Sequence, residues 1–159
     1  MSQWRPHTTG ILIGGLVLIL IALVGSYMAV NFQPTTQLRL NSNVFSVQVA
    51  KTEAEREKGL SGVEKLNPNT GLLMVFSTDG EWGIWMKDMK VPIDILWLNK
   101  DKKVIYIVTD ATPELSTDKT FIPKSPARYV LEVAAGTVKN SGIKINDVAT
   151  FEIDEGTVK

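Results

Sequence analysis

Gly71-Leu-Leu-Met-Val-Phe76 is a continuous apolar run, and it is the stretch that decides the fold class. A short run of this kind is consistent with a strand that is buried in the core of a domain. The chain turns at residues 77–80, and after Pro92 a second apolar stretch, Ile93–Leu98, predicts another buried strand. The fold class then depends on the segments around these two strands.

Five further segments carry strand patterns, namely residues 45–50, 82–87, 104–108, 128–133 and 148–153. Residues 45–50 alternate apolar and polar side chains, which is typical of a half-buried strand, and residues 104–108 are rich in β-branched side chains. Six or more short strands at regular spacing favour an all-β arrangement over βαβ units. We therefore expect a mainly β, compact, sandwich- or barrel-like domain.

One or two short helices should accompany these strands. Thr52-Glu-Ala-Glu55 is a capping box that starts a short helix, and Gly59 is a natural stop for it. Gly136 and Gly142 bracket a second short turn or helix. Four apolar side chains from the strands are expected in the core: Phe76, Ile95, Leu131 and Phe151.

Residues 11–30 read ILIGGLVLILIALVGSYMAV and contain no charge. A helix of this length spans about 30 Å, which is the thickness of one hydrocarbon core. A cleaved signal peptide is the alternative, but its apolar core is usually only about 7–15 residues long and small residues follow it. We therefore favour one uncleaved transmembrane helix. The short tail that contains Arg5 predicts that the following domain lies outside the cytoplasm, although Arg39 makes the positive charges on the two sides nearly equal.

These boundaries divide the chain into four parts. Residues 1–10 form a short N-terminal tail, and residues 11–30 form the transmembrane helix. Residues 31–43 are a polar linker that can end in a first short strand, and residues 44–155 are the soluble, mostly β domain. The expected protein is a single-pass membrane protein with its C-terminal domain outside the cytoplasm.

The composition excludes several classes of function. Lys and Arg total 17, as do Asp and Glu, so the chain has no overall basic field for nucleic acid. The absence of cysteine excludes thiolate metal sites and cysteine nucleophiles. The one histidine, His7, lies in the N-terminal tail, which excludes a histidine-dependent triad in the domain. We expect no cofactor, no metal and no nucleic-acid partner.

The most unusual residue of the domain is Asp94, which interrupts an apolar strand. A buried carboxylate is costly unless it is paired or hydrogen-bonded. Lys87, Arg128 or backbone N–H groups could supply the partner. The carboxyl group is then either a structural partner or a ligand-contacting acid at the edge of a pocket bordered by Trp85 and Lys87.

Glu132 is similar, because it lies between Leu131 and Val133. Asp94 and Glu132 could form a carboxylate pair for acid–base chemistry, provided that the two groups lie about 5–10 Å apart. The candidate pocket comprises six residues: Trp85, Lys87, Asp88, Asp94, Arg128 and Glu132.

Two other residue types allow alternative sites. Methionines can hold a soft metal such as Cu(I), but they more often fill cores. Tryptophans can line a groove for a sugar or a peptide, but they also mostly lie in cores, and Trp97 in its apolar strand should do so. The residues concerned are Met74, Met86, Met89, Trp82, Trp85 and Trp97.

The order and spacing of several short motifs resemble the domain of unknown function 192 family. The resemblance covers roughly Val44 to Ile153 and implies a compact, mainly β domain that is often exported or anchored, with no agreed reaction. Its motifs are Gly59-Leu60, Gly71–Phe76, Trp85–Asp88, Pro92–Ile95, Pro113, Ala127–Glu132, Gly136 and Asp147.

Three hypotheses about function follow from these features. The first is a membrane-anchored, non-catalytic binding or interaction module whose partner is a small molecule or an envelope protein. The second is a small enzyme that uses Asp94 and Glu132 together with Lys87. The third is an envelope structural protein with no small ligand. We favour the first, because the domain contains no nucleophile–base set.

Overall fold

The computed structural model describes residues 17, 20, 35–115 and 119–159. The chain divides into two units, Met1–Gln33 and Pro34–Lys159. The predicted tail, residues 1–10, lies outside the described residues, and so does the transmembrane range 11–30 apart from Val17 and Leu20, which are helical. No helix in the described part of the chain is long and apolar enough to span a bilayer.

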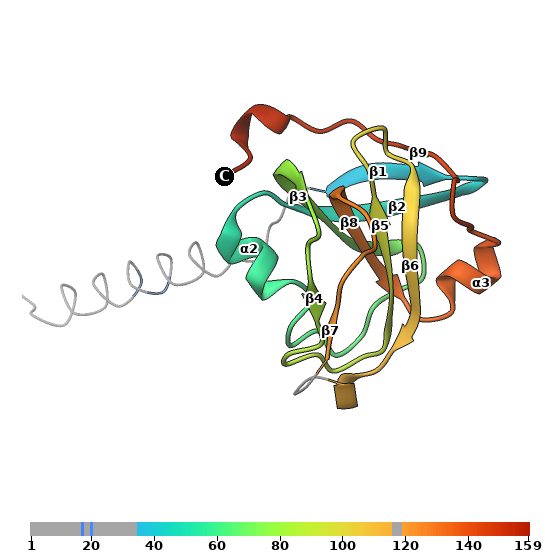
Figure 1. Ribbon diagram of the computed structural model, residues 1–159. Coiled ribbons are helices and arrows are strands. Elements are labelled where there is room, and N and C mark those ends of the chain that lie inside the picture. Colours follow the sequence, from blue (N-terminus) through green and yellow to red (C-terminus); the bar gives the residue numbers. More distant parts are fainter. Residues whose placement is uncertain (1–16, 18–19, 21–34, 116–118) are drawn as a thin grey trace, which may run out of the picture. The chain divides into compact units, whose positions relative to one another are not determined.

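The second unit is built on a seven-stranded sheet with the strand order β6-β5-β8-β3-β2-β1-β9 (Figure 1). A two-stranded sheet pairs β4 with β7. The strands are β1 (Thr35–Leu40), β2 (Asn43–Ala50), β3 (Thr70–Gly80), β4 (Ile84–Trp85), β5 (Ile93–Leu98), β6 (Val104–Ala111), β7 (Thr120–Phe121), β8 (Ala127–Ala134) and β9 (Ala149–Thr150). The prediction of a mainly β domain is confirmed.

The large sheet curls into a half-barrel because its two edge strands are tied together at one end. Lys103, just before β6, forms a β-bridge with Val148, just before β9. The backbone N–H of Ala149 donates to the carbonyl of Lys102 at 2.9 Å, and that of Val104 donates to the carbonyl of Asp147 at 2.8 Å. These bonds shield part of both edges, which would otherwise expose unpaired backbone groups.

Strands β2 and β3 are parallel neighbours, and the connection between them contains the helix α2 (Glu53–Lys58). The expectation that the domain would lack a βαβ unit is therefore wrong. Alternation of apolar residues reports which face of a strand is buried, but not the direction of its neighbour. The capping box that starts α2 is confirmed, since Thr52 accepts from the N–H of Glu55 and the Glu55 side chain accepts from the N–H of Thr52.

The other helices are short. Helix α3 (Thr137–Ser141) lies between Gly136 and Gly142, as expected. Single 3-10 turns follow β6 (η1, Pro113–Leu115) and β9 (η2, Glu155–Thr157).

Strand β1 lies within residues 31–43, the range expected to be a linker. It pairs along its whole length with β2 and buries Leu38 and Leu40. The sheet therefore begins at Thr35.

The sheet is buried on both faces, which explains the continuous apolar run of β3. Leu73 and Val75 face the barrel core, the cluster inside the half-barrel, whereas Leu72, Met74 and Phe76 face the outer core under α2 and β4. The barrel core comprises Leu38, Leu40, Phe45, Val47, Leu73, Val75, Leu96, Leu98, Val104, Tyr129, Leu131, Val133, Val138, Ile143, Ala149 and Phe151. The expected core residues Phe76, Ile95, Leu131 and Phe151 are all buried.

Candidate functional site

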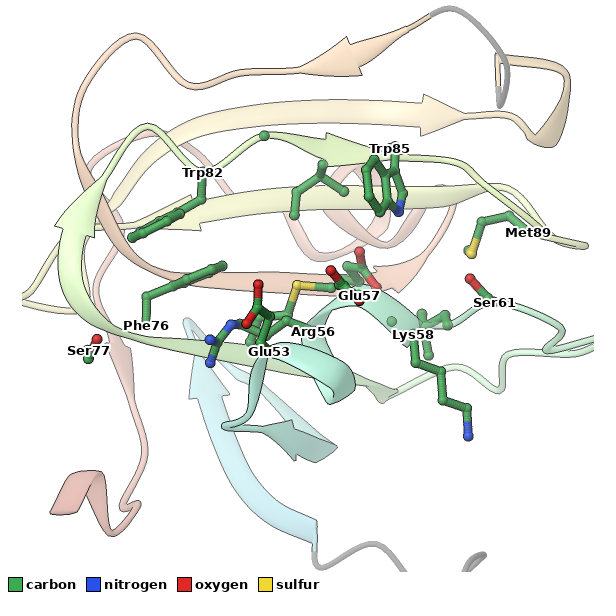
Figure 2. Close-up of a pocket in the computed structure, with 16 residues that line it drawn as sticks. Glu53, Arg56, Glu57, Lys58, Ser61, Phe76, Ser77, Trp82, Trp85 and Met89 are labelled. Carbon is green, nitrogen blue, oxygen red and sulfur yellow. The ribbon is translucent and has the colours of Figure 1, made fainter. Parts of the chain in front are cut away.

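A cavity of about 270 Å³ opens in the outer face of the half-barrel, between α2, β3 and the segment that leads into β4 (Figure 2). Its walls are mostly apolar and aromatic, with charged residues of α2 on one side. The lining residues are Glu53, Arg56, Glu57, Lys58, Gly59, Leu60, Ser61, Met74, Phe76, Ser77, Trp82, Gly83, Ile84, Trp85, Met89 and Glu132.

One wall is a pair of stacked aromatic rings. Phe76 and Trp82 lie with their centroids 4.3 Å apart and their planes 6° from parallel. Trp82 is fixed from both ends, because its Nε1 donates to the carbonyl of Ala127 at 2.9 Å and its own carbonyl accepts from Nε1 of Trp97 at 2.8 Å. Trp85 lies farther along the same segment and is 48% exposed. The aromatic wall is therefore preformed, with one ring open to solvent.

The opposite wall is α2, and Arg56 fixes it against the sheet. The Nη1 atom of Arg56 donates to the carbonyls of Lys51 at 2.7 Å and Val75 at 2.9 Å, and Nη2 donates to the carbonyl of Lys159 at 2.6 Å. Its guanidinium carbon also lies 4.9 Å from the centroid of the Phe76 ring. Arg56 thus serves backbone oxygens and an aromatic face, which makes it a structural cation of the cavity wall.

Glu132 lines the cavity from the middle of the sheet. On β8 it is paired with Leu72 of β3 and with Ile95 of β5, so both of its lateral neighbours are apolar. The residue is 3% exposed, and its Oε2 atom is buried without a hydrogen-bond partner among the described residues. Buried polar atoms are normally satisfied, and an exception calls for a reason.

Burial raises the pKa of Glu132 from 4.5 to about 8. Removal of water disfavours the charged form of an acid, and among the described groups no opposite charge offsets that cost. At pH 7 the side chain is therefore mostly a neutral acid that can donate one hydrogen bond and accept others.

Gly59 keeps the space above Glu132 open. It has φ +50° and ψ −135° at the end of α2, a conformation that only glycine adopts readily. A Cβ atom there would lie 3.4 Å from Cε of Met74 and 3.8 Å from Oε2 of Glu132. The glycine that ends the helix therefore places no side chain between the cavity and the buried acid, whose Oε2 atom is itself closed to solvent.

Of the six residues predicted for the pocket, the cavity includes Trp85 and Glu132. Asp94 is fully buried, but its side chain points to the barrel core together with Leu96, on the opposite face of the sheet from Glu132. The expected carboxylate pair of Asp94 and Glu132 is therefore wrong. Register explains the difference, because Glu132 pairs with Ile95, and successive residues of a strand point to opposite faces.

The partners of Asp94 are backbone groups. Its Oδ1 accepts from the N–H of Asp110 at 2.9 Å, and its Oδ2 accepts from the N–H of Val138 at 2.8 Å. Gly136 caps α3 without a side chain, so Asp94 satisfies an N–H in the first turn of that helix from across the fold. Of the partners expected for Asp94, which were Lys87, Arg128 or backbone N–H groups, the structure supplies the backbone N–H groups. The expectation that Asp94 lies at the pocket edge is wrong, because Asp94 does not line the cavity.

The remaining candidates lie on the surface. Arg128 forms a salt bridge of 2.7 Å with Asp79. Lys87 and Asp88 are exposed, and their carbonyls accept from the Ser61 hydroxyl and the Gly62 N–H. These backbone contacts hold the loop after α2 against the loop after β4.

Of the methionine and tryptophan residues considered as alternative sites, some line the cavity and others lie in the core. Met74 and Met89 line the cavity, whereas Met86 is fully buried, and Trp97 lies in the core as expected. Within the described ranges, no three His, Cys, Asp or Glu side chains form a group that could hold a metal ion.

A family model with the description DUF192, "Uncharacterized ACR", matches residues 36–151. The chain belongs to the DUF192 family. It is similar to a UPF0127 protein of Thermococcus gammatolerans, with 28% identity over 111 residues that cover 69% of this chain and 68% of that protein. It is also similar to a UPF0127 protein of Thermococcus sibiricus, with 27% identity over 113 residues and the same coverage.

Two solved structures share the DUF192 fold of this chain. A protein of Sinorhizobium meliloti, described as a candidate transcription regulator, has a TM-score of 0.71 and 28% identity, and the match covers 75% of this chain and 95% of that chain. A protein of unknown function from Novosphingobium aromaticivorans has a TM-score of 0.67 and 26% identity, and the match covers 73% of this chain and 83% of that chain. These relatives support the fold of the domain.

Sequence reasoning missed the contribution of α2 to the site. In the sequence Gly59 is a helix stop and part of the Gly59-Leu60 motif, and Arg56 is one of many charged residues. The available signal was the capping box followed by a glycine, which fixes where the helix ends. What the helix end covers depends on the parallel β2–β3 crossover, which no local pattern reveals.

Proposed function

We propose that this chain is a binding module, and that its domain takes a small organic molecule into the cavity over Glu132. The single observation that carries the proposal is the buried Oε2 atom, which has no hydrogen-bond partner in the described part of the chain and lies at a preformed, largely apolar cavity. Mostly apolar pockets with one or a few convergent polar groups are the usual form of small-molecule sites. A ligand that hydrogen-bonds to Oε2 would remove the cost of the unsatisfied atom.

The arrangement favours binding over catalysis. Glu132 is separated from Asp94 by the sheet, and the Arg56 guanidinium is bound to backbone carbonyls. The described lining residues therefore provide one acid near neutral pKa without a second group arranged to act with it.

We further propose that residues 11–30 anchor the module in a membrane as one uncleaved helix, with the domain outside the cytoplasm. Twenty residues without a charge support this proposal. Carbonate extraction of membranes should leave the full chain in the pellet, and protease added to spheroplasts should digest the domain. Release of the full chain by carbonate would contradict the anchor, and protection of the domain from protease would contradict the orientation.

Two glycines provide a matched test of the cavity. Gly59 and Gly62 both have positive φ, so an alanine strains the backbone at either position. A Cβ atom at Gly59 enters the space above Glu132, whereas one at Gly62 meets nothing within 4 Å. Ligand binding should therefore weaken in Gly59→Ala and stay unchanged in Gly62→Ala.

The measurement is thermal denaturation of the full chain in phosphatidylcholine nanodiscs, against a panel of cationic, neutral and anionic aromatic and alkyl compounds. Binding to the native state raises the midpoint by mass action. We expect at least one class to stabilise the native protein and Gly62→Ala, and to stabilise Gly59→Ala less. Stabilisation of all three proteins by equal amounts, or of none by any compound, would contradict the proposed site.

A further inference from the structure

We infer that the ligand is an organic cation, an ammonium group on an apolar body, which pairs with Glu132 at the base of the cavity. The inference rests on the proposed function and adds the chemical class of the ligand. It depends on the charges around the cavity, on its aromatic wall and on its size.

The exposed acids Glu53 and Glu57 and the cations Arg56 and Lys58 balance in formal charge, so the placement of these groups around the cavity, and not their sum, favours a cation. Glu53 and Glu57 are exposed acids on α2, and in Figure 2 they extend toward the aromatic side chains. Arg56 is bound to three backbone carbonyls, and Lys58 extends away from the aromatic wall. An entering ammonium group therefore meets acids at the mouth and a third acid, Glu132, at the base.

The aromatic wall also favours a positively charged ligand. The faces of tryptophan and phenylalanine rings carry partial negative charge and attract cations. Phe76 is covered by Trp82 on one face and by the Arg56 guanidinium, so the solvent-exposed ring of Trp85 is the one that offers its face to a ligand. Neighbouring Ile84 and Met89 are apolar, so the body of the ligand can be apolar while its head is charged.

Glu132 distinguishes a cation from a neutral ligand through its proton. Without a ligand the buried acid is mostly protonated at pH 7, because its pKa is raised to about 8. An ammonium group beside it favours the carboxylate. Binding then converts R–NH₃⁺ and Glu132–COOH into an R–NH₃⁺ carboxylate pair, and one proton passes to the solvent. A neutral hydroxyl compound would form a hydrogen bond to the acid and release no proton.

The cavity volume sets the size of the probe. An apolar protein cavity of about 150 Å³ is known to bind benzene, and this cavity measures about 270 Å³. A phenyl ring with a short aminoalkyl chain therefore fits the available space. Phenethylamine is a suitable cationic probe, and 2-phenylethanol and phenylacetate are neutral and anionic compounds of nearly the same shape.

The test is isothermal titration of the three probes into the full chain in phosphatidylcholine nanodiscs, at pH 6.5 and in two buffers with different ionisation enthalpies. Phenethylamine should bind at least about tenfold more tightly than the other two, since buried charge pairs at binding sites are worth more than about 1.4 kcal/mol. Its binding should release close to one proton. In Glu132→Gln, which keeps the shape but cannot ionise, the affinity should fall at least about tenfold and the proton release should disappear.

Three results would contradict the inference that the ligand is a cation. They are tighter or equal binding of 2-phenylethanol or phenylacetate, binding of phenethylamine without proton release, and unchanged affinity in Glu132→Gln. If a neutral or anionic probe binds and Gly59→Ala weakens it, the cavity is still a ligand site and only the class of ligand is wrong. If none of the three probes binds, the inferred ligand class is wrong. The proposed function is then decided by thermal denaturation of the native protein, Gly59→Ala and Gly62→Ala with the wider panel of compounds.

Discussion

Asp94 and Glu132 are two buried acids on neighbouring strands, and they have opposite surroundings. Asp94 accepts two backbone N–H bonds, from Asp110 and Val138, and it lies in the barrel core. Glu132 is offset from it by one residue in register, faces the outer cavity, and leaves Oε2 without a partner among the described residues. On one face of the sheet the acid Asp94 therefore joins elements of the fold by hydrogen bonds. On the other face the acid Glu132 keeps an oxygen that could bind a ligand.

The comparison shows that burial alone does not identify a functional acid. A buried acid whose hydrogen-bonding capacity is used by the backbone is explained by the fold, as is Asp94. A buried acid that lines a cavity and lacks a partner is not explained by the fold alone, and its raised pKa is a feature common at functional sites. Two experiments separate the two acids by their effects on stability, and a third tests the open end of the cavity beside Glu132.

The largest expected effect is on the pH dependence of stability through Glu132. Its pKa rises from 4.5 to about 8 on folding, so between these values the folded state binds more protons than the unfolded state. The native protein should therefore lose stability as the pH rises through this window, and the loss should be complete above pH 8. Relative to Glu132→Gln, which lacks this ionisation, the loss should total about 3–5 kcal/mol.

Urea unfolding of both proteins at pH 5 and pH 9, followed by tryptophan fluorescence, measures this difference. Other titrating groups cancel in the comparison, since both proteins contain them. A constant difference in unfolding free energy across the window would show that Glu132 is not a strained acid.

The second effect concerns Asp94 as a structural residue. Asp94→Asn replaces one acceptor oxygen by an NH₂ group, which then faces a backbone N–H of Asp110 or Val138. We expect a loss of about 1–3 kcal/mol from the unmet backbone donor. Asp79→Asn is the matched control, because it removes a surface acid paired with Arg128, and it should cost at most about 1 kcal/mol.

Urea midpoints and slopes of the two variants, compared at one pH, decide this point. Equal midpoints for Asp94→Asn and the native protein, with equal slopes, would mean that the backbone bonds to Asp94 contribute nothing. The contrast between the two acids would then no longer hold.

The smallest effect is expected at the open end of the cavity. Trp85 is about half exposed and contacts solvent, so Trp85→Ala should change stability by no more than about 0.5 kcal/mol. It should weaken binding of phenethylamine about two- to fivefold, the usual contribution of one exposed aromatic face to a cation. Equal titration curves for the native protein and Trp85→Ala would remove this ring from the site.

Local patterns in the sequence predicted much of the fold. The apolar run 71–76 predicted a buried strand because both faces of β3 are covered. The Thr52 capping box fixed the start of α2, since the required residues are adjacent in the chain. The burial of Asp94 and Glu132 followed from their apolar neighbours, and both are buried.

The pairing of strands could not be predicted in the same way. Register between β5 and β8 places Asp94 and Glu132 on opposite faces, and a shift by one residue would have placed them together. The parallel crossover that carries α2 over the sheet is likewise a long-range feature. Five of the sixteen lining residues, from Glu53 to Gly59, depend on that crossover, and of the six residues predicted for the pocket only Trp85 and Glu132 line the cavity.

The most direct test of the account is the ionisation of Glu132 itself. Carbon-13 NMR of side-chain-labelled glutamate, with the signal assigned from its absence in Glu132→Gln, gives the titration midpoint with and without phenethylamine. We predict a midpoint near 8 in the free protein, and one lower by at least about one pH unit at saturation, because the bound cation favours the carboxylate. A midpoint near 4.5 in the free protein, unchanged by the amine, would contradict the account.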